Sequence, residues 1–74
     1  MSPVGEITAM MPGRILSILV KEGQRISAGE TLCILEAMKM HNEVRAPRDG
    51  IVADLRVAEG AIVNGGDLLM NVKY

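Results

Sequence analysis

The chain has 74 residues, about half the length of a typical domain, so it forms one domain at most. Apolar residues make up 49% and charged residues 23%, a balance that favours a folded chain over a disordered one. The net charge is −1 and Tyr74 is the only aromatic residue, so neither a basic surface nor stacking rings are available for nucleic acid.

Other classes of protein are excluded by short local features. No apolar run is longer than four residues, so we expect no membrane-spanning segment. No basic residue and no long apolar stretch precede Arg14, so we expect no secretory signal. Cys33 is the only cysteine and His41 the only histidine, which excludes an internal disulfide and argues against a cysteine-based metal site or a catalytic triad.

An internal repeat organises the chain. A shift of 37 residues overlays the sequence on itself without an insertion, from Gly13 on Gly50 to Leu35 on Val72. We therefore expect one domain over residues 1–74 with half-repeats at about 13–35 and 50–72. Two copies are too few to stack as a solenoid, so they are expected to wrap around each other with approximate two-fold symmetry.

Each half-repeat reads as β-structure from its first glycine onward. A strand rich in Ile, Val and Leu follows Gly13 or Gly50, a Glu-Gly pair closes it, and a second turn follows at 28–30 or 65–67. The shared apolar positions lie two, five and seven residues after the opening glycine. The first of these is out of phase with the other two, which predicts a bulge inside the strand. The expected core consists of Ile15, Ile18, Val20, Ile26, Leu32, Val52, Leu55, Val57, Val63 and Leu69.

The segment between the half-repeats reads Glu36-Ala37-Met38-Lys39-Met40-His41. The 37-residue shift matches Lys39 with Ser2 on one side and with a position just past the C-terminus on the other, so we expect its turn at the pole opposite both chain ends. An amine there is solvated and accessible to another protein. Tight hairpin turns often need positive φ, which Met and Lys disfavour, so their presence favours a functional explanation.

Individual residues also have simpler interpretations. A lone lysine is usually a solvated charge, and methionines usually fill gaps in a core. Alternation along a strand would place Met38 and Met40 on the side opposite Lys39, unless both lie at the tip with it. Cys33 lies in an apolar run and is expected to be a small buried core residue. His41 is expected to be a solvated strand residue.

The acidic residues receive equally simple interpretations. Glu36 is expected to be a surface acid beside the turn. Glu22 and Glu59 each precede a turn glycine, which suggests a role in turn formation and not in paired-carboxylate catalysis.

The sequence Ala37-Met38-Lys39-Met40 resembles the attachment motif of biotinyl domains, the biotin carboxyl carrier family. Residues 19–29 resemble the stretch before the family's lysine and residues 46–50 the stretch after it, so the resemblance covers about residues 7–73. It implies an all-β flattened barrel, or barrel-sandwich hybrid, of two four-stranded antiparallel sheets with pseudo-two-fold symmetry and the lysine on a hairpin turn. No insertion separates Gln24 from Gly29, so the thumb of some bacterial carriers is expected to be absent.

The resemblance also implies a function. Biotin would be joined covalently to Lys39 by a separate biotin protein ligase through a biotinyl-adenylate, with Ala37, Met38 and Met40 completing the motif. The arm would carry CO2 between a biotin carboxylase site and a carboxyltransferase site of a biotin-dependent carboxylase, decarboxylase or transcarboxylase. The domain itself would be non-catalytic, bind no metal and be monomeric when isolated. We expect it in the cytoplasm, or in the mitochondrial matrix if it belongs to a eukaryotic carboxylase.

Two alternatives remain open at the level of sequence. A lipoyl carrier domain of a dehydrogenase complex has the same fold and the same lysine placement. Such domains usually present an acidic residue before the lysine and a small one after it, whereas Met38 and Met40 occupy those places here. An unmodified hybrid-barrel interaction module would not need Lys39.

Overall fold

The computed structural model describes residues 3–74, and within them the chain forms strands and no helix. Thus no described segment is a helix that could span a membrane. The strands of the described chain are β1 (Val4–Thr8), β2 (Gly13–Ile18), β3 (Arg25–Ile26), β4 (Thr31–Ala37), β5 (Met40–Arg45), β6 (Gly50–Leu55), β7 (Ile62–Val63) and β8 (Leu68–Lys73).

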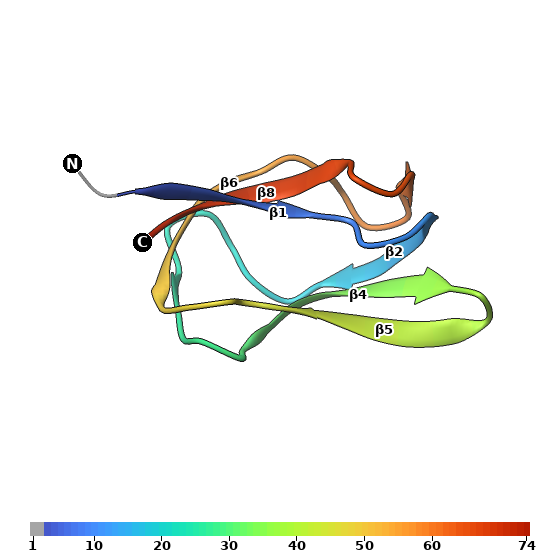
Figure 1. Cartoon of the computed structure of the whole chain (residues 1–74), viewed down its shortest axis with the longest axis horizontal. Helices are drawn as coiled ribbons and strands as arrows, with labels where there is room; N and C mark the ends of the chain where they lie inside the picture. Colours follow the sequence, from blue (N-terminus) through green and yellow to red (C-terminus); the bar gives the residue numbers. More distant parts are fainter. Residues whose placement is uncertain (1–2) are drawn as a thin grey trace.

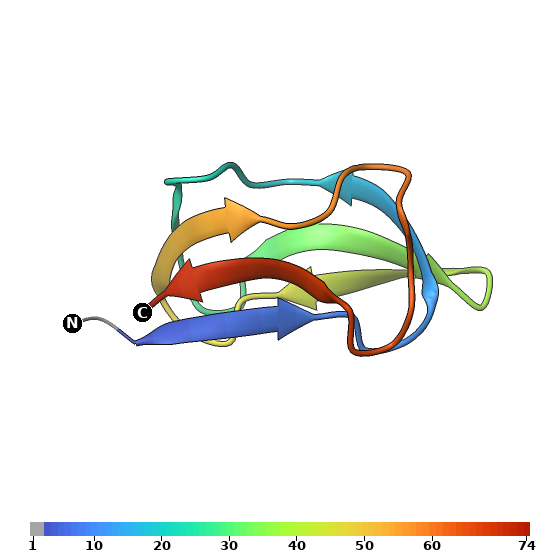
Figure 2. The same cartoon turned by 90° about the horizontal axis from the view of Figure 1, so that it is seen from above.

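The strands form two four-stranded sheets that face each other (Figures 1 and 2). One sheet has the order β1-β8-β6-β3 and the other β5-β4-β2-β7, and every pair of neighbours is antiparallel. The expected flattened barrel of two antiparallel sheets is therefore confirmed. The residues between Gln24 and Gly29 are taken up by β3 and the turn after it, which leaves no inserted thumb.

The two sheets are related by the same offset of 37 residues that relates the halves of the sequence. Adding it converts β1 into β5, β2 into β6, β3 into β7 and β4 into β8. The backbone hydrogen bonds follow the same rule, since Gly23 N–H donates to Val52 O at 2.7 Å and Gly60 N–H donates to Ile15 O at 2.7 Å. Each half-repeat thus extends further toward the N-terminus than the sequence indicated.

The equivalent strands β2 and β6 both contain the expected bulge. The register of β2 against β4 shifts between Ile15 and Ser17, and the register of β6 against β8 shifts between Val52 and Asp54. An extra residue at this point changes the face on which the following side chains lie. The bulges therefore explain why the apolar positions of each half-repeat change phase.

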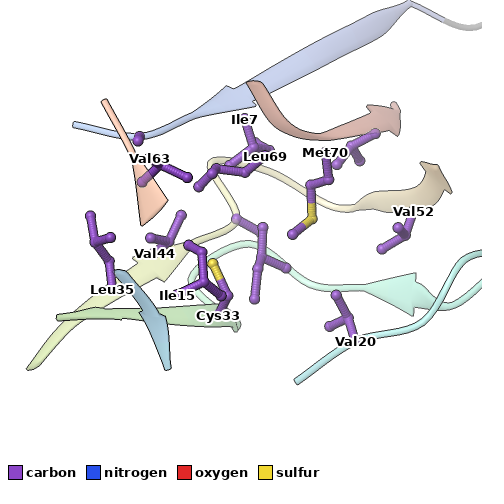
Figure 3. Packing of buried hydrophobic residues seen from close by; sticks show 14 of the residues in the cluster. Ile7, Ile15, Val20, Cys33, Leu35, Val44, Val52, Val63, Leu69 and Met70 are labelled. Atoms are coloured by element: carbon purple, nitrogen blue, oxygen red, sulfur yellow. The ribbon is translucent and has the colours of Figure 1, made fainter. Parts of the chain in front are cut away.

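The core is a single aliphatic cluster between the sheets (Figure 3). Its buried members are Ile7, Ala9, Ile15, Val20, Ile26, Leu32, Cys33, Leu35, Ala37, Val44, Ala46, Val52, Val63, Leu69, Met70 and Val72. Three expected members, Ile18, Leu55 and Val57, are only half-buried against this cluster. Ile18 and Leu55 are the last residues of β2 and β6, so they cover the edge of the core instead of filling its centre.

Two glutamates join one half-repeat to the other. Glu22 Oε2 accepts a hydrogen bond from the Leu55 N–H at 2.9 Å, and Glu59 Oε2 accepts one from the Ile18 N–H at 2.9 Å. The prediction that these side chains serve their own turns was therefore wrong. Each satisfies the backbone at the end of the opposite central strand, a relation that local sequence does not reveal.

Candidate functional site

The hairpin between β4 and β5 is closed by two residues, Met38 and Lys39. Their φ angles are 54° and 64°, and they are the only non-glycine residues with positive φ in residues 3–74. Positive φ at both central residues of a two-residue loop defines a type I′ turn, which usually contains Asn and Gly. Side chains with a Cβ are disfavoured there by about 1–2 kcal/mol per residue. The expected strained turn is thus observed.

The side chains of the turn project into solvent. Met38 is 86% exposed and Met40 64% exposed, and Lys39 is exposed as well. Both methionines therefore lie at the tip with the lysine and not in the core. Lys39 takes part in none of the side-chain hydrogen bonds or ion pairs described for residues 3–74.

The turn lies at the end of the molecule opposite the start of β1 and the end of β8, as expected (Figures 1 and 2). The molecule measures 38 Å along its longest axis, which runs between these two ends. The sequence match of Lys39 to Ser2 falls outside the described residues. The amine at the tip therefore lies far from these two strand ends.

Ala37 lies in the core below the turn, whereas the two methionines are exposed. It is buried and faces Gly13 on β2, where an added Cβ would lie 3.1 Å from the Ala37 Cβ and 2.3 Å from the Glu36 carbonyl oxygen. A side chain at Gly13 would therefore push β2 and β4 apart. The small residue before Met38 is explained by this close packing.

Glu36 lies at the centre of a charged row on the outer face just below the turn. It pairs across the strands with Arg14 on β2 and His41 on β5. Arg14 Nη2 donates to Glu36 Oε1 at 3.2 Å, and His41 Nε2 lies 3.7 Å from Glu36 Oε2. His41 is exposed, as expected, and Glu36 is a surface acid with partners from both neighbouring strands.

Asn42 is a positioning residue that was not predicted from the sequence. Its Nδ2 donates to the Leu35 and Met40 carbonyl oxygens, both at 3.2 Å, and so holds the two strands of the hairpin together behind the turn. Asn is depleted in strands because it can bond its own backbone, so an Asn close to the expected hairpin turn was the available signal.

Cys33 lies in the core, as expected, and takes no part in the site. Burial raises the pKa of its thiol to about 11, so the sulfur remains protonated and unreactive at neutral pH. Within residues 3–74, no three His, Cys, Asp or Glu side chains lie close enough together to hold a metal ion.

The arrangement at the tip can therefore present a primary amine but offers little to transform a substrate. Two cavities, of about 420 and 480 Å³, are lined by residues other than those of the turn.

Comparison with known proteins agrees with this geometry. A family described as "Biotin-requiring enzyme" matches residues 3–72. The chain is 44% identical over 71 residues to a biotin carboxyl carrier protein of Streptococcus mutans, covering 96% of this chain and 55% of that protein. It is 56% identical over 48 residues to the methylmalonyl-CoA decarboxylase subunit gamma of Veillonella parvula, covering 65% of this chain and 37% of that protein. The chain thus spans about half, or less, of these relatives.

A solved structure shares the fold. A single-chain, multi-domain long-chain acyl-CoA carboxylase superposes with a TM-score of 0.90 at 30% identity, covering 95% of this chain and 7% of that one. The similar proteins thus include parts of multi-domain and multi-subunit carboxylases and decarboxylases. The family match covers almost the whole chain and confirms the resemblance seen in the sequence. This chain belongs to the biotin-requiring enzyme family, as a non-catalytic biotin carrier domain.

Proposed function

We propose that Lys39 is the residue to which biotin is joined, and that the domain carries CO2 between two active sites of a larger biotin-dependent enzyme. The observation that carries this proposal is the two-residue turn. Its amine is exposed and takes part in none of the hydrogen bonds or ion pairs described for residues 3–74. The backbone of the turn has positive φ at both residues, a conformation that Met and Lys disfavour. Neither packing nor turn preference explains these residues, whereas display of the amine does.

The residues present fit covalent attachment by a separate biotin protein ligase. The Lys39 Nζ would attack the activated carboxyl carbon of the ligase's acyl-adenylate, with loss of a proton from nitrogen and departure of AMP. The product is an amide, which removes the positive charge of the side chain. Met38 and Met40 offer the ligase apolar contacts on either side of the amine, and Ala37 and Asn42 hold the turn in place.

Once joined to the domain, biotin supplies the chemistry of accepting CO2 at one site and releasing it at another. The domain contributes a high local concentration of the arm at both sites without forming new contacts. The partners would be the biotin carboxylase and carboxyltransferase domains or subunits of an assembly such as those of its relatives. We propose a monomeric carrier in the cytoplasm, or in the mitochondrial matrix of a eukaryotic cell.

Three lysines make the test sharp, because the chain contains only Lys21, Lys39 and Lys73. The chain is incubated with biotin ligase, ATP and biotin, and its intact mass is measured. The Lys21→Arg/Lys73→Arg double variant is expected to gain one biotin. Lys39→Arg is expected to gain none, because its guanidinium keeps the charge but is not deprotonated to a nucleophile.

The same variants distinguish the alternatives. A parallel reaction with lipoate ligase, ATP and lipoate tests the lipoyl carrier, and lipoylation without biotinylation would favour that function. A biotin that is still gained by Lys39→Arg would place the attachment elsewhere. No modification in either reaction would leave the interaction module as the better explanation.

A further inference from the structure

The outer faces of the two sheets carry equivalent rows of exposed side chains with different chemistry. One, here called the tip row, crosses β7, β2, β4 and β5 through the residue pairs of the sheet. Its members are Ile62, Arg14, Glu36 and His41. The other, here called the pole row, crosses β3, β6, β8 and β1 at the end where β1 begins and β8 ends. Its members are Arg25, Ile51, Lys73 and Val4. The offset of 37 residues converts one row into the other.

The two rows are equivalent in position but differ in charge. In the tip row, Glu36 offsets Arg14. In the pole row, Lys73 stands in the place of Glu36, so the row holds two cations and no acid. The ion pairs within residues 3–74 involve neither Arg25 nor Lys73.

A cavity opens beside the pole row, here called the pole pocket. Its volume is about 420 Å³, and its lining includes Arg25, Ile51, Lys73, Tyr74 and Asp49. Ile51 remains 40% exposed, and the half-buried ring of Tyr74 adds to the apolar wall. The pocket thus combines an apolar lining with two unpaired cations.

The remaining charges near the pocket favour an anionic occupant. Asp49 is the one acid in the lining and accepts a hydrogen bond from the Ala28 N–H at 2.8 Å, so a single negative charge stands against the two cations of the lining. The guanidinium of Arg48 lies over the Tyr74 ring, 4.5 Å from its centroid, and adds a third cation at the edge. An occupant bearing carboxylates would therefore meet complementary charge.

We propose that the pole pocket docks an acidic peptide segment of a partner protein, in which an apolar side chain is flanked by Asp or Glu. The apolar side chain lies against Ile51 and Tyr74, and the carboxylates pair with Arg25 and Lys73. A cavity of this volume suits a side chain and its neighbours. The whole chain has a net charge of −1, and the cations at the pole are few, which favours a short peptide over a membrane surface or a nucleic acid.

The location of the pocket gives the docking a use. The tip and the pole lie at opposite ends of the 38 Å long axis (Figure 1). A partner segment bound at the pole therefore leaves the β4–β5 turn uncovered. The use of this contact as an anchor for the carrier rests on the proposed function of Lys39, whereas the binding itself does not.

The binding is tested by NMR titration of the ¹⁵N-labelled chain with acetyl-Asp-Glu-Leu-Glu-Asp-amide up to about 1 mM. Saturable shifts are expected at the amides of Arg25, Ile51 and Lys73, and added NaCl should weaken them. The Arg25→Gln/Lys73→Gln variant is expected to bind about tenfold more weakly. The control Arg14→Gln/Arg56→Gln loses the same charge outside the pocket and should change affinity less than twofold.

Further arms separate the other occupants. A peptide with Gly in place of Leu should bind several-fold more weakly, and equal binding would reduce the pocket to a general anion site. The same shifts with inorganic phosphate would overturn the proposal in the same way. The chain is also sedimented with phosphatidylserine vesicles. Co-sedimentation that is lost in Arg25→Gln/Lys73→Gln would overturn the proposal and identify a membrane surface as the occupant.

The absence of saturable shifts with the acidic peptide would also overturn the proposal. The outcome is independent of the function proposed for Lys39. Arg25→Gln/Lys73→Gln should accept biotin at the wild-type rate. A wild-type chain that accepts no biotin would refute the carrier function, but it would not affect the result of the peptide titration.

Discussion

The β4–β5 turn and the place between β8 and β1 occupy equivalent positions in the two half-repeats, yet they are built differently. In the turn, the chain runs on from the buried Ala37 through two exposed residues. At the other end, the Tyr74 N–H donates to the Pro3 carbonyl oxygen at 2.8 Å, and no chain joins β8 to β1. The scaffold is therefore duplicated while the displayed amine occurs once, so stability and attachment should depend on different residues.

The largest expected effect concerns the duplicated core. Leu32 and Leu69 are equivalent and fully buried, so Leu32→Ala and Leu69→Ala should each lower the free energy of unfolding by about 2–5 kcal/mol. Leu55→Ala should cost less than Leu69→Ala, because Leu55 is only half-buried. Urea denaturation measures all three.

The matched control for these core changes lies at the tip. Lys39→Ala should alter the free energy of unfolding by no more than about 0.5 kcal/mol, since the side chain is exposed. A cost of Lys39→Ala comparable to that of Leu69→Ala would contradict the separation of core from turn.

A second expected effect comes from the thiol in the core. Burial raises the pKa of Cys33 from 9.0 to about 11, so the unfolded chain releases this proton at lower pH than the folded chain. The free energy of unfolding should therefore fall as pH rises from 9 to 11, by about 2 kcal/mol from this group. Cys33→Ala should lack that component. Parallel pH profiles for the two proteins would show that the thiol is accessible in the folded state.

The bonds that cross between the halves should contribute less. Glu22→Ala and Glu59→Ala each leave one backbone N–H of the opposite half without its acceptor and should cost about 1 kcal/mol. The costs should be similar because the two bonds are equivalent. Glu6→Ala removes an exposed carboxylate from β1 and serves as the control. A cost for Glu59→Ala no larger than that of Glu6→Ala would show that the crossing bonds do not hold the halves together.

The smallest effect should appear at the turn itself and have the opposite sign. Met38→Asn places a residue that tolerates positive φ in a type I′ turn, so it should stabilise the fold by about 0.5–1 kcal/mol. Met40→Asn changes the same side chain on strand β5, where φ is not positive, and should give no gain. A destabilising Met38→Asn would indicate that the turn is not strained and would weaken the functional explanation of its sequence.

Much of this architecture was predictable because a repeated sequence restricts the folds available to it. The phase change between Ile15 and Ile18 predicted the bulge, and the unmatched position of Lys39 predicted its pole. The outer strands β1 and β5 were not identified as part of the repeat. The offset does match Glu6, Ile7 and Ala9 with Glu43, Val44 and Ala46, but the residues around these three differ between the halves, so the signal is short.

The rest of the site was not predictable for a different physical reason. Glu22 and Asn42 act through contacts whose partners are set by strand register and by packing across the barrel. Local patterns in the sequence give the period of a strand but not its neighbour. The pole row became apparent only when the register had placed Arg25, Ile51 and Lys73 side by side.

The hydrogen bond between Tyr74 and Pro3 affects how many exposed amines this fold could present. A short linker between these residues would close β8 and β1 into a hairpin like that of β4 and β5, because the two sites are equivalent. If Met and Lys formed that linker, the result would be a cyclic protein with a reactive side chain at each end. The geometry of the described residues would thus permit a second displayed amine, whereas the sequence places one at the β4–β5 turn.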